Sequence, residues 1–291
     1  METGKFEAAL ALLDKAYRAN KALGSPTSIY ALATTHNAIH ILRGEYDRTL
    51  EALLPSLELD ENQILSGLWI DIFQQLAWCY YDLGAYDEGL KHCQKAISRH
   101  GYINSTGRAP AFAVLALLQT RSGNLSEADA AVTKGWENFD LGWQTYSGWW
   151  ETLSILEAEA ELALAQGELA RAARCIDQLL GKYDELKLRH LKPCIQFLQA
   201  RVELAAGKNE NAYKSPTNAL ALSDEMGAHR DVWAMCWALS ELEIERGSES
   251  AATQLKERAC NEVMFIAEHA GTLELRETFL FRPDVQLVWG T

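Results

Sequence analysis

Several features of membrane-bound, disulfide-stabilised or secreted proteins are missing from this sequence. No run approaches the roughly 18 consecutive apolar residues that a membrane span requires, and the N-terminal residues lack the basic, apolar and small-residue order of a signal peptide. The six cysteines include no Cys-x-x-Cys pair and lie far apart, at Cys79, Cys93, Cys175, Cys194, Cys236 and Cys260. We therefore expect reduced, mostly buried thiols in a soluble, cytoplasmic chain.

Positive charge is also scarce and dispersed. The 291 residues contain 27 Lys and Arg against 40 Asp and Glu, for a formal net charge of −13. Because the basic residues form no block, the sequence argues against a surface that follows a phosphate backbone, and we expect no nucleic-acid partner. Apolar residues make up 48% of the chain, which is enough for a substantial core.

Catalytic and metal-binding motifs are absent as well. The sequence contains no Gly-x-Ser-x-Gly, no glycine-rich phosphate loop and no cysteine in a family signature. His36 and His40 have helical spacing, but no His-Glu-x-x-His glutamate and no third ligand accompany them. Acidic residues also occur at helical spacing, and a solvated helix face explains both pairs, Glu157 with Glu161 and Glu241 with Glu245. We predict no catalytic residue, no metal, no cofactor and no enzymatic activity.

What the sequence does contain is a repeat. Short turns of the form Gly-x-apolar-x-x-small separate longer runs of helical character, as in GEYDRT, GAYDEG and GNLSEA. Successive glycines are separated by 40, 40, 39, 44, 40 and 40 residues, and they are Gly4, Gly44, Gly84, Gly123, Gly167, Gly207 and Gly247. Such a constant period predicts an array of similar structural units.

The residues around each glycine keep the same register. Small residues recur five places after the glycine, at Ala9, Thr49, Gly89, Ala128, Ala172, Ala212 and Ala252. A second set of small residues lies seven places before the glycine, at Asn37, Ala77, Ala116, Ala160, Ala200 and Ser240. Matched small side chains let two consecutive helices pack closely, and the glycine suits the C-terminal cap of the first helix. The pattern predicts antiparallel helical hairpins stacked into an all-α solenoid.

The third unit, LAWCYYDLGAYDEGLKHCQKAI, resembles a tetratricopeptide repeat (TPR), with Tyr80, Gly84, Tyr86 and Ala96 in the signature places. The resemblance implies a right-handed α-α superhelix. The usual period is 34 residues, so the longer period here is similar to that of sensor arrays in bacterial multidomain regulators, such as signal-transduction ATPases with numerous domains and cyclase–ATPase–TPR fusions. The closing residues resemble the last helices of such proteins at Leu275, Arg276, Phe279, Leu280, Pro283 and Val285.

We expect one solenoid domain over residues 1–291, with an initial half repeat, six full repeats and capping helices over 262–291. Because the turn at Gly4 follows Met1 so closely, the first unit has only its second helix, which suggests a fragment of a larger protein. Pro55 and Pro216 fall inside predicted second helices, where proline removes a hydrogen bond. We expect each helix to stop early or kink there, most visibly at Pro216.

An aromatic segment, WENFDLGWQTYSGWW, fills the longest interval between glycines. Its rings could pin an enlarged loop by packing between repeats, because large aromatics mostly fill space. They could instead be exposed as a hot spot for a peptide or a cyclic ligand. The candidate hot-spot residues are Trp143, Tyr146, Trp149 and Trp150.

The resemblance also implies a binding surface. In TPR arrays the first helices of the hairpins line a concave groove, at about two, three, six and ten places before the turn glycine. Transferred to this chain, that rule selects Gln74, Trp78, Asp82, Arg121, Glu157, Glu161, Arg201, Trp237, Glu241 and Glu245. Such a groove would accept a helical or extended segment with basic groups and an apolar anchor. It could also be a hydrated groove that only spaces two domains.

Three functions remain open on this sequence. The first is a protein-interaction or scaffold module of a bacterial signalling or transcription-regulatory protein, which binds a protein, a peptide or other domains of its parent chain. The second is a small-molecule sensor, in which an inducer binds in the groove, and a closed apolar pocket would favour it. The third is an oligomerisation element that uses the apolar face left uncovered at the first unit.

Overall fold

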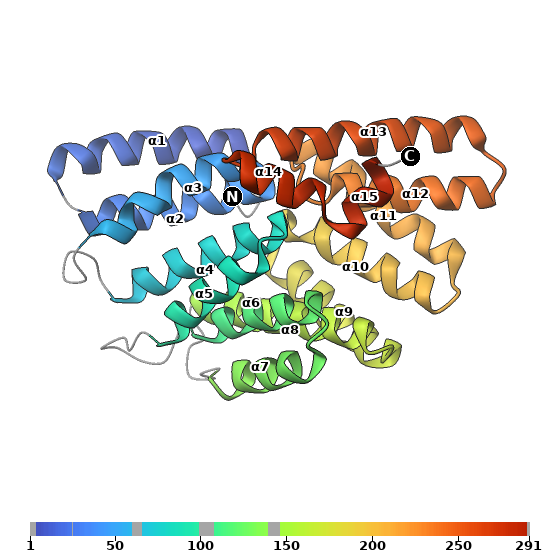
Figure 1. Cartoon of the computed structure of the whole chain (residues 1–291), viewed down its shortest axis with the longest axis horizontal. Coiled ribbons are helices and arrows are strands. Elements are labelled where there is room, and N and C mark those ends of the chain that lie inside the picture. Colours follow the sequence, from blue (N-terminus) through green and yellow to red (C-terminus); the bar gives the residue numbers. More distant parts are fainter. Residues whose placement is uncertain (1–3, 25, 60–65, 99–107, 139–145, 290–291) are drawn as a thin grey trace.

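The chain is built from helices stacked side by side (Figure 1). The computed structural model describes residues 4–24, 26–59, 66–98, 108–138 and 146–289, and within these ranges it contains no β-strand. The prediction of an all-α fold is confirmed. None of the described helices is long and apolar enough to cross a membrane.

Consecutive helices form antiparallel pairs at the predicted period. The first helix, α1 (Phe6–Leu23), packs against the next helix and precedes six hairpins. These are α2 (Pro26–Leu42) with α3 (Tyr46–Leu53), α4 (Ser66–Leu83) with α5 (Tyr86–Ser98), α6 (Arg108–Arg121) with α7 (Leu125–Glu137), α8 (Tyr146–Ala165) with α9 (Leu169–Leu186), α10 (Lys192–Ala205) with α11 (Asn209–Met226), and α12 (Val232–Glu245) with α13 (Glu249–Glu268). Two short helices, α14 (Leu273–Leu280) and α15 (Pro283–Trp289), follow the last hairpin, and residues 262–268 belong to α13.

The turn glycines have the backbone conformation that their place in the repeat requires. All seven have φ between +71° and +81°, the left-handed region where a side chain is strained. At the third turn Gly84 N donates to Tyr81 O and Ala85 N donates to Tyr80 O, which satisfies two carbonyls at the end of α4. The glycines therefore end each first helix as predicted.

The two prolines of the second helices behave differently. Pro55 lies in a 3₁₀ turn, Leu54–Glu58, directly after α3, so this helix stops early as predicted. Pro216 lies inside α11, which continues to Met226, so the helix does not stop early there and the alternative, a kink, stays a prediction. Because Pro216 is buried, apolar packing of its ring offsets part of the cost of the lost hydrogen bond.

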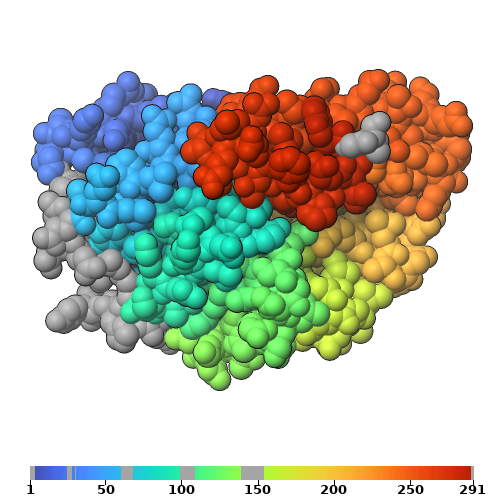
Figure 2. Space-filling model, in the orientation of Figure 1, coloured from blue at the N-terminus to red at the C-terminus, as the bar shows by residue number. Residues whose placement is uncertain are grey.

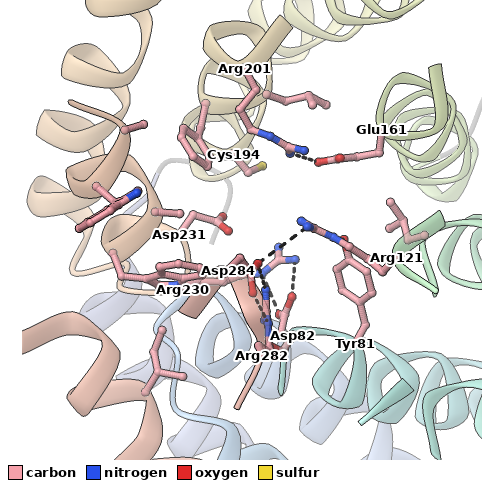
Figure 3. A pocket seen from close by; sticks show the side chains of 18 of the residues that line it. Tyr81, Asp82, Arg121, Glu161, Cys194, Arg201, Arg230, Asp231, Arg282 and Asp284 are labelled. Carbon is pink, nitrogen blue, oxygen red and sulfur yellow. Dashed lines mark hydrogen bonds and ion pairs between the residues drawn. The ribbon is translucent and has the colours of Figure 1, made fainter. Parts of the chain in front are cut away.

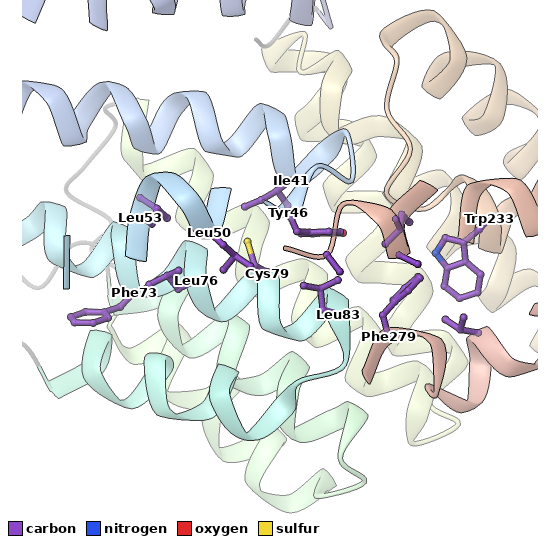
Figure 4. Close-up of a cluster of buried hydrophobic side chains, with 14 of the residues drawn as sticks. Ile41, Tyr46, Leu50, Leu53, Phe73, Leu76, Cys79, Leu83, Trp233 and Phe279 are labelled. Atoms are coloured by element: carbon purple, nitrogen blue, oxygen red, sulfur yellow. The ribbon is translucent and has the colours of Figure 1, made fainter. Parts of the chain in front are cut away.

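The array closes on itself, which a one-dimensional stack of repeats does not require. One buried hydrophobic cluster contains Tyr46 and Leu76 from the early helices together with Trp233 and Phe279 from the late ones (Figure 4). The helices α14 and α15 lie against α13, and α14 also contacts α4 (Figures 1 and 2). The first and last parts of the chain therefore share a core.

Three of the turn glycines lie at this closure. A Cβ atom at Gly4 would lie 2.5 Å from the sulfur of Met226, and one at Gly84 would lie 2.7 Å from Cγ of Arg282. At Gly44 it would lie 3.2 Å from Ile266. At the later turn glycines an added Cβ would meet no described atom within 4 Å, so the positive φ is what favours glycine there. At Gly4, Gly44 and Gly84, the absence of a side chain also lets residues of the late helices come close to the turns.

This difference gives a matched pair of substitutions. Gly167→Ala introduces left-handed strain alone and is expected to cost roughly 1–2 kcal/mol. Gly84→Ala adds a collision with Arg282 and is expected to cost more, with faster hydrogen exchange in α14. Urea unfolding and amide exchange of the two variants measure this. Equal losses of stability, with α14 unaffected, would contradict the role of Gly84 in closure.

Candidate functional site

A cavity of about 300 Å³ lies inside the closed array (Figure 3). Its walls come from the first helices of five successive hairpins, α4, α6, α8, α10 and α12, and from α14 and α15. The resemblance to TPR arrays implied that first helices line the groove, and the cavity has this arrangement. Five acidic and four basic side chains face it, together with aromatic rings.

The part of each helix that lines the cavity changes along the array. On α4 the lining residues are Tyr81 and Asp82, two or three places before the turn glycine. On α8 they are Glu157 and Glu161, six and ten places before it. On α12 they extend from Trp233 to Ala238, nine to fourteen places before the glycine. Each helix is rotated and displaced relative to the one before it, so the lining moves steadily towards the helix N-terminus.

The structure brings six of the ten predicted groove residues together and leaves four apart. The six that line the cavity are Asp82, Arg121, Glu157, Glu161, Arg201 and Trp237. Of the others, Gln74 is buried at 7% exposure and Trp78 packs beside Arg230. Glu241 pairs with Lys256, and Glu245 accepts a hydrogen bond from Asn209, both outside the cavity. A fixed offset from the glycine fails for these four because the lining shifts along the array.

A buried ion pair joins the two ends of the array at the cavity wall. Arg230, in the turn before α12, donates from Nε and Nη2 to the two carboxylate oxygens of Asp82 at 2.8 and 2.9 Å. Only 11% and 9% of these side chains are exposed. The Arg230 guanidinium also lies 5.0 Å from the centre of the Trp78 ring, and Tyr46 donates to Asp82 at 3.0 Å. Residues of three elements therefore hold the pair: α3, α4 and the turn before α12.

The remaining arginines are paired as well. Arg201 contacts Glu161 at 2.5 Å across the cavity from the first pair, and Arg282 contacts Asp284 at 2.6 Å. Arg282 also donates to the backbone carbonyl of Asp82, which attaches the segment between α14 and α15 to α4. Arg121 donates to the Tyr81 hydroxyl at 3.2 Å and lies 3.8 Å from Asp284. Figure 3 shows these side chains, with dashed lines for the ion pairs among them.

Sequence reasoning missed the residues that come from outside the regular repeat. Arg230 and Asp231 precede α12, and Arg282 and Asp284 flank the proline that begins α15. The repeat alignment has no place for these positions, because they lie beyond the aligned turns. The charged residues on either side of Pro283 were a local signal, since an arginine and an aspartate at a helix start suit an ion pair with a neighbouring element.

Comparison with solved structures identifies the architecture. A Rap protein in complex with the competence and sporulation factor superposes with a TM-score of 0.65 at 10% identity, over 95% of this chain and 84% of that one. A signal-transduction ATPase with numerous domains from Pyrococcus horikoshii, which has a TPR sensor, matches with a TM-score of 0.54 at 12% identity. The match covers 98% of this chain, which spans about half the length of that ATPase.

The fold is a tetratricopeptide-like repeat array. No protein-family model and no curated protein matches the sequence. At 10–12% identity the solved structures show the fold of the array and do not assign its ligand.

Two of the five carboxyl groups that line the cavity have no ion-pair or hydrogen-bond partner among the described residues. They belong to Glu157 on α8 and to Asp231 before α12, and both line the cavity. Burial raises the pKa of Glu157 to about 7 and raises the pKa of Asp231, although Arg230 opposes both shifts. By contrast, Arg201 and Arg121 outweigh burial and lower the pKa of Glu161. The cavity is thus lined both by carboxyl groups in ion pairs and by carboxyl groups without such a partner.

The array offers little support for other site chemistry in its described part. All six cysteines are described and free, and four of them are buried, as predicted. Burial raises the pKa of the Cys194 thiol at the cavity, which disfavours the nucleophilic thiolate. No group of three metal-ligating side chains is found among the described residues. Instead of holding a metal, His36 contacts Asp14 and His40 contacts Glu45.

The proposed aromatic hot spot stays a prediction. Trp143 lies outside the described residues, as do the side chains of Tyr146, Trp149 and Trp150. One ring of the segment is described: Trp136 donates from Nε1 to Glu159 at 2.9 Å, so it links α7 to α8.

Breaking the buried pair should destabilise the array strongly. Arg230→Ala leaves the Asp82 carboxylate buried without its cation, and we expect a loss of about 3–5 kcal/mol in the free energy of unfolding. Lys91→Ala removes the exposed pair with Glu88 and should change the free energy of unfolding little, because solvent screens that pair. Chemical denaturation of both variants tests this. A loss at Arg230 no larger than that at Lys91 would contradict the role of the buried pair.

Glu157 should make stability depend on pH. Its folded-state pKa lies above its unfolded value of 4.5, so the folded state binds more protons in between, and stability falls as the pH rises from about 4.5 to 7. Glu157→Gln is expected to stabilise the array at pH 8, by on the order of 1–3 kcal/mol, and to have little effect at pH 4. Thermal or urea unfolding across this range provides the measurement. An equal effect at both pH values would contradict burial as the cause.

Proposed function

We propose that this chain is a binding module of a regulatory protein and that its cavity receives a short peptide or the end of a protein segment. The observation that carries the proposal is the convergence of charged and aromatic side chains from five repeats and the closing helices on one cavity. Paired charges in fixed positions give specificity, and Trp237 and Phe197 provide an apolar wall.

The structural neighbours support a regulatory role. The Rap protein is described in complex with the competence and sporulation factor, and the ATPase has its TPR array as a sensor. Transferred to this chain, these roles suggest that the array receives a ligand and passes the effect to other domains. The closure contacts offer a means, because a ligand in the cavity touches both ends of the array and can favour either the closed or an opened state.

A small-molecule ligand is the second candidate. A volume of about 300 Å³ is at the lower end of the range for small-molecule sites. The charged lining departs from the apolar pocket that would favour an inducer, so the candidate ligand is polar. Oligomerisation through α1 stays a prediction, supported by Leu12 and Leu23, which are 66% and 79% exposed on that helix.

Peptide display on the immobilised chain tests the first proposal, with affinities of selected peptides then measured by calorimetry. Trp237→Ala should weaken binding at least about tenfold, since a buried Trp anchor contributes about 2 kcal/mol or more. Glu241→Gln and Glu245→Gln are matched controls, because they alter the same helix outside the cavity. Failure to select any peptide would contradict the peptide proposal. Equal loss in the controls would place the ligand in the open groove.

A further inference from the structure

The arginines of the cavity have little capacity left for an anionic ligand. Each has a carboxylate within 4 Å, and three of the lining carboxylates serve all four guanidinium groups. The pairs are Arg230 with Asp82, Arg201 with Glu161, Arg282 with Asp284, and Arg121 with Asp284. An anion would have to compete with these existing pairs, two of which are held by further hydrogen bonds to the backbone or to Tyr46.

The acidic residues, in contrast, are in excess. The carboxyl groups of Glu157 and Asp231 have no hydrogen-bond or ion-pair partner in the described part of the chain, and both line the cavity. Arg230 lies nearby, but two of its N–H groups donate to Asp82. Its positive charge is therefore largely neutralised by that carboxylate. Five acidic side chains against four arginines leave one uncompensated negative charge when all are ionised.

The surroundings of the two free carboxyl groups suit an organic cation. Glu157 comes from α8 and Asp231 from the turn before α12, so they approach the cavity from separate elements. Phe197 and Trp237 line the same cavity and can cover the apolar stem of a side chain. A hydrated metal ion has no set of three suitable ligands here among the described residues.

We propose that Glu157 and Asp231 form a recognition site for the cationic group of the ligand, an ammonium or guanidinium group on a short apolar stem. This proposal rests on the cavity being the binding site of the array, and it names the chemistry of the ligand. Such a group occurs at a peptide N-terminus, on a Lys or Arg side chain, and in free amines. Its charge would neutralise the excess negative charge of the cavity and provide hydrogen bonds to both carboxylates.

Proton uptake supports the same assignment. The groups whose charges reach Glu157 are Arg230, Glu161, Asp231 and Asp82, from α4, α8 and the turn before α12. Cys194 of α10 and Tyr183 of α9 also lie near and stay neutral, because burial raises their pKa. Since Glu157 has a pKa of about 7, a cation should bind more tightly at pH 8 than at pH 6 and displace the proton.

The experiment uses ligands that differ only in charge. Peptides selected by display are compared with versions in which each Arg is replaced by citrulline, its neutral analogue, and the free amine agmatine forms a separate arm. Binding is measured by calorimetry for the full chain and for the double variant Glu157→Gln with Asp231→Asn. The control double variant Glu241→Gln with Glu245→Gln removes two acids of the same formal charge outside the cavity.

We expect selected peptides to carry a basic residue or to require a free N-terminus. Citrulline exchange, or N-acetylation where the N-terminus is the cation, should weaken binding to the natural chain at least tenfold. In the Glu157 and Asp231 double variant that difference should disappear, whereas the control double variant should retain it. Because Glu157→Gln is expected to stabilise the fold at pH 8, the first double variant should remain folded. Circular dichroism of both double variants tests this.

Three other outcomes would distinguish a failure of the cation site from a failure of the binding module. Peptides that bind without any dependence on a cation would overturn the cation site and leave the binding module standing. Binding of agmatine that depends on Glu157 and Asp231, with no peptide selected, would support the cation site and identify a small amine as the ligand. Absence of both peptide and agmatine binding would overturn both proposals.

Discussion

The closure of the array depends on the contact between Arg230 and Asp82. A repeat array is held together by neighbouring units and has no intrinsic need for its ends to meet. Here a bidentate ion pair, 148 residues apart in sequence, joins the end of α4 to the start of α12. Because desolvation opposes the burial of two charges, we expect this pair to contribute more to the uniqueness of the closed arrangement than to its total stability.

Apolar packing supplies the stability that the ion pair does not. Tyr46 and Leu76 share a buried cluster with Trp233 and Phe279, so separating the ends would expose large aromatic side chains to water. Turn glycines permit this approach on one half of the array. Specific polar contacts therefore set the register of the closure, and the apolar cluster makes it favourable.

The cavity is a consequence of this closure. Its walls come from both ends of the array, so the affinity of a ligand and the closed arrangement are thermodynamically linked. Arginines that pair with acidic residues across the cavity hold the walls in place, while Glu157 and Asp231 keep unused hydrogen-bonding capacity. A molecule bound in this cavity would touch the same residues that close the array.

The sequence by itself determined the repeat, the helical hairpins and the places where first helices end. These features are local: a glycine with positive φ and small residues at fixed offsets act over one or two helices. The resemblance to TPR arrays, whose first helices line the groove, also selected six residues of the cavity. Only the tertiary structure decided that the ends meet and that Arg230 and Arg282 join the site. Closure results from small rotations accumulated over six hairpins, and contacts between distant repeats leave no periodic pattern in the sequence.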